Sequence, residues 1–283
     1  MEFVTTVKDM QIRSLEALRQ GRRIALVPTM GFLHDGHLSL LEEGRRRGDL
    51  LVLSLFVNPT QFGQGEDFES YPRDLGRDAD LARRAGVDLL FAPDARDMYP
   101  PGYATFVEVE GLTDTLCGRS RPGHFRGVTT VVCKLFTIVQ PRVALFGRKD
   151  FQQLAVLRRM TEDLNLPVEI VGMPIIREKD GLAMSSRNSY LSNGEREQAL
   201  ALCDAIRLAK DAVRQGEGSA ARLLGLVRQR IEKEPDARID YLQICHGDTL
   251  KDLESIDRQA VLLMAVHIGR TRLIDNSYLW EED

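Results

Sequence analysis

In the first 176 residues, short apolar runs alternate with longer segments in which apolar residues recur every three or four positions. The short runs carry no regular polar alternation, as expected for strands of a sheet that is covered on both faces. They lie at residues 24–27, 50–57, 87–92, 143–146 and 168–171. The helical segments between them lie at residues 38–47, 74–85, 128–139 and 151–164. Strands that alternate with helices predict an α/β fold with a doubly wound parallel sheet.

The pattern changes after about residue 176. Two charged helical segments, 195–215 and 219–234, come first. Three strand-like segments follow with no long helix between them, at residues 238–245, 260–266 and 271–275. We therefore predict two domains, a catalytic domain over residues 1–176 and a smaller α+β domain over residues 177–283.

Composition narrows the class of protein. Hydrophobic residues make up 43% and charged residues 28% of the chain, and the net charge is -4. These values are typical of a globular protein and give no electrostatic basis for nucleic-acid binding. The chain shows no signal peptide and no apolar run of the roughly 18 residues that a membrane helix needs. We expect a cytoplasmic protein with neither a nucleic-acid nor a membrane partner.

The four cysteines do not form a recognisable framework. They lie far apart and contain no Cys-x-x-Cys pair, at Cys117, Cys133, Cys203 and Cys245. Neither a zinc ribbon nor a small disulfide scaffold fits this spacing.

The strongest candidate site follows the first strand. Residues 28–37 read Pro-Thr-Met-Gly-Phe-Leu-His-Asp-Gly-His and lead into a helix. Ligands of open α/β sheets bind beyond the carboxyl ends of the strands, and the N-terminus of a helix favours phosphate. Gly31 and Gly36 would let the backbone approach such a ligand closely.

His34 and His37 lie three residues apart in this segment. On a helical turn both can reach one anionic group. Two structural histidines or a zinc site are the alternatives, although zinc needs a third ligand and none lies nearby in the sequence.

Two further motifs also follow strands. Residues 56–62 read Phe-Val-Asn-Pro-Thr-Gln-Phe, in which Asn58 is a natural turn former and Gln61 could hold a hydroxyl or carboxylate. Residues 146–153 read Phe-Gly-Arg-Lys-Asp-Phe-Gln-Gln. There Asp150 is a natural N-cap, and Lys149 is either a phosphate ligand or a surface lysine.

A fourth motif, Met-Ser-Ser-Arg at residues 184–187, supplies two hydroxyls and a guanidinium that can follow phosphate groups. Alternatively it is a turn that carries serines. The basic segment 118–127 either closes over an acidic substrate or is a solvated loop.

Together the motifs resemble the pantothenate synthetase family over residues 27–191. The first motif resembles the His-x-Gly-His signature of the Rossmann-like nucleotidylyltransferase and class I synthetase superfamily. The second and third resemble the Phe-Val-Asn-Pro-x-Gln-Phe and Phe-Gly-x-Lys-Asp-x-Gln-Gln patterns of the family. Relatives commonly carry Glu at position 148, where this chain has Arg148. The fourth is similar to the mobile Lys-Met-Ser-Lys-Ser loop, with Arg187 in the cationic role.

The resemblance implies an ATP-dependent ligase that joins (R)-pantoate to β-alanine through a pantoyl adenylate and releases pyrophosphate and AMP. An adenylyltransferase of the same superfamily, which transfers AMP to a phosphorylated acceptor, is the alternative; it would not carry the second and third motifs. A non-catalytic RNA-binding relative of a tRNA synthetase is a third class, and the net charge of -4 argues against it.

The resemblance also assigns residues. His34, His37, Lys149 and Arg187 are the catalytic candidates and, with Mg²⁺, would surround the triphosphate with positive charge. Gln61 and Gln153 are expected to bind pantoate, Gln61 also β-alanine, and Asp78 is the candidate magnesium contact. The expected ATP contacts are Met30, Gly31, Phe32, Leu33, His34, Asp35, Gly36, His37, Gly147, Arg148, Lys149, Asp150, Ile176, Met184, Ser185, Ser186 and Arg187. A homodimer, with residues 177–283 as a lid, is expected as well.

Overall fold

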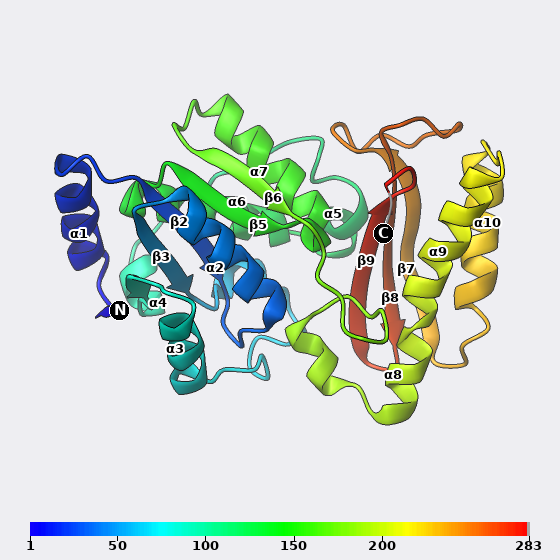
Figure 1. Ribbon diagram of the computed structural model, residues 1–283, viewed down its shortest axis with the longest axis horizontal. Coiled ribbons are helices and arrows are strands. Elements are labelled where there is room, and N and C mark those ends of the chain that lie inside the picture. The colour runs from blue at the N-terminus through cyan, green and yellow to red at the C-terminus, as the bar shows by residue number, and fades with distance from the viewer. Residues whose placement is uncertain (282–283) are drawn as a thin grey trace.

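The structure is a computed structural model that describes residues 1–281, and it contains two sheets (Figure 1). The larger sheet is parallel, with the strand order β1-β4-β3-β2-β5-β6. Its strands are β1 (Glu2–Val4), β2 (Ile24–Thr29), β3 (Leu50–Leu55), β4 (Leu89–Phe91), β5 (Val143–Gly147) and β6 (Glu169–Met173). This order confirms the predicted doubly wound parallel sheet.

Helices cover both faces of this sheet. Leu26 and Val52 point toward the cluster that contains α1 (Val7–Arg19), α6 (His124–Val139) and α7 (Phe151–Asp163). The alternate residues Val27 and Leu53 pack against α2 (Asp35–Arg47) and α3 (Leu75–Arg84). Because side chains on both faces are buried, these strands have no polar face, and their sequence is apolar throughout.

The strand order reverses at β2, which pairs with β3 on one side and β5 on the other. From this point the chain builds the sheet outward in opposite directions. The loops that follow β2 and β5 therefore diverge and leave a crevice at the carboxyl ends of the strands.

The second part begins with three helices, α8 (Asn193–Ala199), α9 (Ala201–Arg214) and α10 (Ala220–Ile231). The single helix predicted at residues 195–215 is divided at Leu200 into α8 and α9. An antiparallel sheet follows, in the order β7 (Ala237–His246), β8 (Ala260–Ile268) and β9 (Thr271–Tyr278).

This second sheet lies between two sets of helices (Figure 1). Leu262 and Met264 of β8 pack with α9 and α10, whereas Leu263 and Ala265 pack with α6, α7 and the short α5 (Leu116–Ser120). One apolar cluster thus continues from the first part of the chain into the second. The predicted domain boundary at residue 176 stays a prediction, since the core does not divide there.

The elements that were absent from the predicted set include β1 and α1. The outer face of α1 carries the exposed Ile12, Leu15 and Leu18, while its buried face includes Met10 and Ser14. Apolar residues on the outside obscure the helical periodicity. The remaining short elements are α4 (Ala95–Met98) and the 3-10 helices η1 (Pro59–Gln61), η2 (Arg148–Asp150) and η3 (Ser186–Tyr190). Within residues 1–281, none of the helices has the length and apolar character of a membrane-spanning helix.

Candidate active site

A cavity of about 220 Å³ lies at the carboxyl ends of β2 and β5, where the strand order reverses. All four sequence motifs contribute to its wall. The predicted residues that line it are Met30, His34, Gly36, His37, Gln61, Gly147, Lys149, Asp150, Gln153, Ile176, Met184, Ser185, Ser186 and Arg187. A second cavity of about 1090 Å³ extends toward β9 and shares Lys149, Asp150 and Gln153 with the first. Segments far apart in sequence therefore form one continuous site.

Five residues predicted to contact ATP lie beside this cavity rather than in its wall. Leu33 is buried in the core, and the Arg148 guanidinium forms an ion pair with Glu281 at 2.9 Å. The other three are Gly31, Phe32 and Asp35. Their predicted contacts with ATP stay predictions.

Asp78 braces the loop after β2. Its carboxylate oxygens accept hydrogen bonds from the backbone N–H groups of Phe32 at 2.6 Å and Leu33 at 2.7 Å. Gly31 and Phe32 have φ values of +89° and +52°, and a Cβ on Gly31 would lie 3.0 Å from the Asp78 carboxylate. Only 2% of Asp78 is exposed. The carboxylate thus stabilises an unusual backbone conformation at the edge of the cavity.

Both oxygens of Asp78 accept one backbone hydrogen bond each, and its predicted contact with Mg²⁺ stays a prediction. In the described part of the chain, no group of three or more His, Cys, Asp or Glu residues could hold a metal ion.

The two histidines stack at the N-terminus of α2. Their ring centroids are 4.0 Å apart, and the backbone N–H of His34 donates to Nδ1 of His37 at 3.3 Å. A neutral His37 therefore carries its proton on Nε2. Gly36 makes this arrangement possible, because a Cβ there would lie 2.9 Å from Cε1 of His34. Nδ1 of His34 is buried and has no hydrogen-bond partner among the described residues.

Both imidazoles are neutral near pH 7. Burial, followed by the charge of Lys149, lowers the pKa of His34 to about 4. Burial, then His34 and Lys149, lowers the pKa of His37 well below its usual value. The positive charge expected of these histidines is therefore absent in the ligand-free protein. They can act as neutral hydrogen-bond donors, and Lys149 and Arg187 supply the charge.

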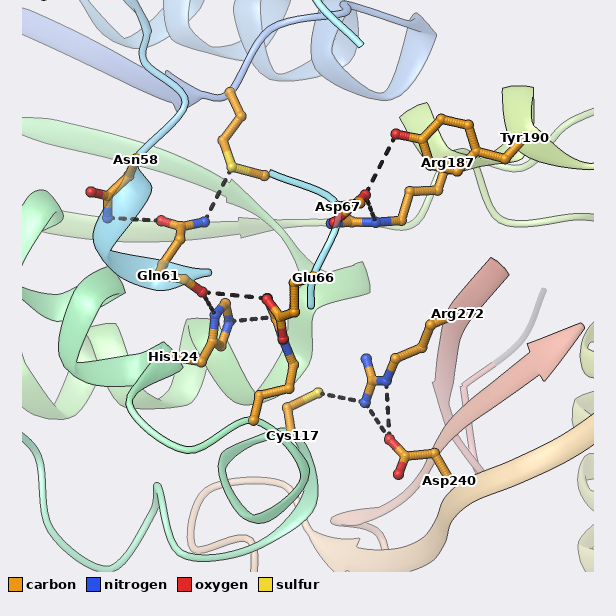
Figure 2. Close-up of polar contacts among 12 residues, drawn as sticks. Asn58, Gln61, Glu66, Asp67, Cys117, His124, Arg187, Tyr190, Asp240 and Arg272 are labelled. Atoms are coloured by element: carbon orange, nitrogen blue, oxygen red, sulfur yellow. Dashed lines mark hydrogen bonds and ion pairs between the residues drawn. The ribbon is translucent and has the colours of Figure 1, made fainter. Parts of the chain in front are cut away.

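Gln61 is held in one orientation by a buried asparagine. Asn58 donates from Nδ2 to Oε1 of Gln61 at 3.1 Å (Figure 2). Its Oδ1 accepts a hydrogen bond from the Tyr99 hydroxyl at 2.9 Å. Gln61 Nε2 lies 3.2 Å from the Met30 sulfur. Because its oxygen is already bonded, Gln61 presents its NH₂ group to the cavity. Asn58 therefore orients the Gln61 side chain in addition to forming the turn considered in the sequence analysis.

His124 and Arg121 support Gln61 from behind. Nδ1 of His124 is 2.8 Å from the Gln61 carbonyl oxygen, and its Nε2 is 3.1 Å from the Arg121 guanidinium. Burial, followed by the charge of Arg121, lowers the pKa of His124 to about 4, so the ring is neutral and donates through Nδ1. Arg121 also pairs with Glu66 at 2.6 Å (Figure 2). The 118–127 segment therefore stabilises the position of the Gln61 backbone.

Lys149 lies in the turn between β5 and α7, and Gln153 lies in the first turn of α7. Asp150 takes the N-cap position of α7, as predicted, but its side chain makes no capping hydrogen bond. Lys149, Asp150 and Gln153 line both cavities. This corner therefore places an ammonium group, a carboxylate and an amide where the two cavities meet.

Arg187 closes the rim of the site. Its Nε and Nη2 atoms each donate to Asp67 at 2.8 Å (Figure 2). The Tyr190 hydroxyl donates to the Ser70 carbonyl at 3.2 Å. Ser186 donates to the Phe32 carbonyl at 3.4 Å, which connects the fourth motif to the first. Sequence reasoning missed Asp67, which belongs to no motif and is recognisable only by its contact with Arg187.

Comparison with known proteins shows the family. The pantoate-beta-alanine ligase family model matches residues 2–278. The pantothenate synthetases of Syntrophotalea carbinolica and Geotalea daltonii are 68% and 59% identical over 282 residues, and each alignment covers 100% of both chains.

Solved structures agree. The pantothenate synthetase of Thermus thermophilus is 48% identical, with a TM-score of 0.94 over 99% of this chain and 100% of that one. The pantoate-beta-alanine ligase of Francisella tularensis, solved in complex with β-γ ATP and β-alanine, is 30% identical, with a TM-score of 0.82 over 100% of this chain and 99% of that one. The chain therefore belongs to the pantoate-beta-alanine ligase family, which confirms both the resemblance and the ligase activity expected from the sequence.

Proposed function

We propose that this site activates pantoate as an adenylate with ATP and then transfers the pantoyl group to β-alanine. The convergence of all four motifs on one cavity carries the proposal, because it brings phosphate-binding and acid-binding groups together. Lys149, Arg187 and the two histidines form the phosphate side, and Gln61 and Gln153 form the acid side. An adenylyltransferase would need no such acid-binding pair.

In the first step, a carboxylate oxygen of pantoate attacks the α-phosphorus of ATP. The bond from that phosphorus to the bridging oxygen breaks, and pyrophosphate leaves with the electron pair. Lys149 and Arg187 offset the charge on the leaving phosphates, and His37 donates from Nε2. The unpartnered Nδ1 of His34 supports a ligand contact at the same place.

In the second step, the amine of β-alanine attacks the carbonyl carbon of the adenylate. The bond from that carbon to the phosphate oxygen breaks, AMP leaves, and the amine loses a proton to solvent. Gln61 and Gln153 hold the pantoyl group in place, so catalysis consists mainly of positioning. The larger cavity adjoins Gln153 and gives β-alanine a route of approach. The Francisella relative binds β-alanine together with an ATP analogue.

Mg²⁺ is proposed to arrive with ATP rather than on a protein site. When bound, it neutralises phosphate charge. Asp78 braces the loop after β2 with both of its oxygens. The residues near the triphosphate are then Lys149, Arg187 and Asp150.

The remaining proposals follow from the family and from the chemistry of the chain. A homodimer is proposed, and sedimentation equilibrium would test it. The four cysteines are free thiols, which supports a reducing, cytoplasmic location. Residues 177–283 are proposed to cover the site, with the 184–187 loop as the segment that closes on ATP.

Pyrophosphate exchange tests the proposed mechanism. Labelled pyrophosphate should enter ATP when pantoate and Mg²⁺ are present, and β-alanine alone should not support the exchange. Adding β-alanine with pantoate should then release AMP. Exchange that ignores pantoate but responds to a phosphorylated acceptor such as 4′-phosphopantetheine would reject the adenylate of pantoate.

A further inference from the structure

Two neighbouring residues of β9, Asp275 and Asn276, contact the active-site segments from the second part of the molecule. Both are buried, with exposed fractions of 2% and 5%. Neither belongs to the four motifs. Buried polar side chains persist where they satisfy specific partners, so these partners indicate what the residues do.

Asn276 contacts the backbone on either side of the Lys149 Cα. Its Nδ2 donates to the carbonyl oxygens of Arg148 at 3.0 Å and Lys149 at 2.8 Å. Both N–H bonds of the amide are therefore used within the turn η2. Two bonds to consecutive carbonyls determine the orientation of the peptide that carries the Lys149 side chain.

Asp275 contacts the segment that leads into the fourth motif. Its two carboxylate oxygens accept from the Arg177 guanidinium at 2.8 and 3.0 Å. Arg177 also donates to the Gly181 carbonyl at 3.1 Å, and it pairs with Ala183 in an isolated β-bridge. The next residue is Met184, so this small hairpin sets where the 184–187 loop begins.

The strand that carries both residues is itself firmly held. β9 pairs with β8 along its whole length, including the pairs Asn276 with Leu263 and Asp275 with Met264. β8 is buried on both faces, by the two core clusters described above. Any shift of β9 would disturb both clusters, so Asp275 and Asn276 are fixed reference points for the site.

We propose that Asp275 and Asn276 are positioning residues for the ligase reaction. They set the spacing between Lys149 and the 184–187 loop, so that Lys149 and Arg187 reach the same triphosphate. The inference rests on the proposed phosphate roles of Lys149 and Arg187. It makes the second sheet a scaffold for the phosphate site in addition to a cover over it.

Three variants on β9 separate positioning from packing. Asn276→Ala removes both hydrogen bonds, and Asn276→Asp keeps the shape but turns a carboxylate oxygen toward two carbonyls. Ser277→Ala is the matched control on the same strand. We expect Asn276→Ala to weaken ATP binding about tenfold and Asn276→Asp to weaken it more. The control should stay within about twofold, and so should the KM for β-alanine in every variant. Asn276→Asp that binds ATP as well as wild type, in a folded protein, would overturn the proposal.

A double-mutant cycle shows whether Asn276 acts through Lys149. The dissociation constant for ATP is measured by calorimetry for wild type, Asn276→Ala, Lys149→Ala and the double variant. If the effect passes through Lys149, Asn276→Ala should change ATP binding less than about twofold in the Lys149→Ala background. Equal effects in both backgrounds would overturn the inference and leave the role of Lys149 intact. Wild-type ATP binding by Lys149→Ala would instead reject the proposed phosphate role itself.

Asp275 has its own cycle, with Arg187→Ala as the second substitution. Asp275→Asn keeps the shape but weakens the pair with Arg177. We expect weaker ATP binding by Asp275→Asn and little further loss in the Arg187→Ala background. Additive losses would remove Asp275 from the proposal. Asp275→Asn removes the charge of a buried carboxylate whose partner is the half-buried Arg177, which can also destabilise the fold. The Asn276 variants therefore decide the proposal independently.

Discussion

The parallel sheet and the antiparallel sheet contribute different groups to the active site, and the antiparallel sheet lines only the larger of the two cavities. The parallel sheet contributes consecutive residues at the ends of its strands, including His34, His37, Gln61 and Lys149. The antiparallel sheet contributes side chains from within β9 that hold other residues in place. Loops at the carboxyl ends of parallel strands have free backbone groups and helix N-termini, so they suit ligands. β9 is an edge strand that pairs with β8 along its length, and Asp275 and Asn276 act from it through their side chains.

The residues proposed to contact the substrates therefore follow strands of the parallel sheet, whereas residues of the antiparallel sheet hold some of them in position. If the division is right, substitutions at the strand ends should alter individual substrate steps strongly. Substitutions at supporting residues should act more weakly and through another residue.

His37→Ala should have the largest effect. Loss of a donor to the leaving phosphates should slow pantoate-dependent pyrophosphate exchange about 10²–10³-fold, with little change in folding. Since the ring is neutral, His37→Gln keeps an N–H donor and should retain more activity than His37→Ala. Equal losses in the two variants would show that the imidazole acts by some property other than a neutral donor.

Lys149→Ala and Gln153→Ala should separate the two sides of the cavity. Loss of a charged contact should raise the KM for ATP about 10–100-fold in Lys149→Ala and leave the KM for pantoate nearly unchanged. Gln153→Ala should show the reverse pattern, with a smaller change because its contact is neutral. Steady-state titration of each substrate measures both. A rise in both KM values in both variants would contradict separate phosphate and acid sides.

Asp67→Asn should act modestly and in the opposite direction. Asp67 and the phosphates compete for Arg187, so removing the carboxylate charge should tighten ATP binding about threefold. Glu69→Gln, an exposed carboxylate on the same loop, is the control. Calorimetry measures both. Weaker binding in Asp67→Asn would mean that Asp67 supports Arg187 in the complex as well.

The buried histidines predict that the stability of the folded protein depends on pH. His34 and His124 have folded-state pKa values of about 4, below the value of 6.5 for an exposed histidine. The unfolded state therefore binds more protons between these values, and the folded state loses stability as the pH falls from about 6.5 toward 4.

Thermal denaturation at pH 7 and pH 5 measures this loss. His124→Asn removes one of the histidines with a lowered pKa, so its melting temperature should fall by a few degrees less than that of wild type over the same interval. The quantity to compare is the change in melting temperature between pH 7 and pH 5 in each protein. The melting temperatures themselves will differ, because the substitution also removes the hydrogen bond to the Gln61 carbonyl. An identical change in melting temperature in the two proteins would show that His124 is already protonated in the folded protein at pH 5.

The sequence predicted the parallel sheet, the strands of the second sheet and the four motifs. Apolar runs and the glycine-containing turns after them are local patterns, so strand positions and strand ends can be read directly from the chain. The errors also have local causes. Exposed apolar residues on α1 concealed that helix, and Leu200 interrupts a segment whose apolar periodicity runs on from α8 into α9.

The sequence by itself determined which residues stand at the strand ends, and with them the family and the reaction. Only the tertiary structure decided the charge of His34 and His37, the partner of Arg187 and the support from Asp275 and Asn276. A pKa or a hydrogen-bond partner depends on distances between segments that are remote along the chain. Asp67 lies 120 residues before Arg187, and Asn276 lies 127 residues after Lys149. No local pattern records such pairs, because folding alone brings them within reach of each other.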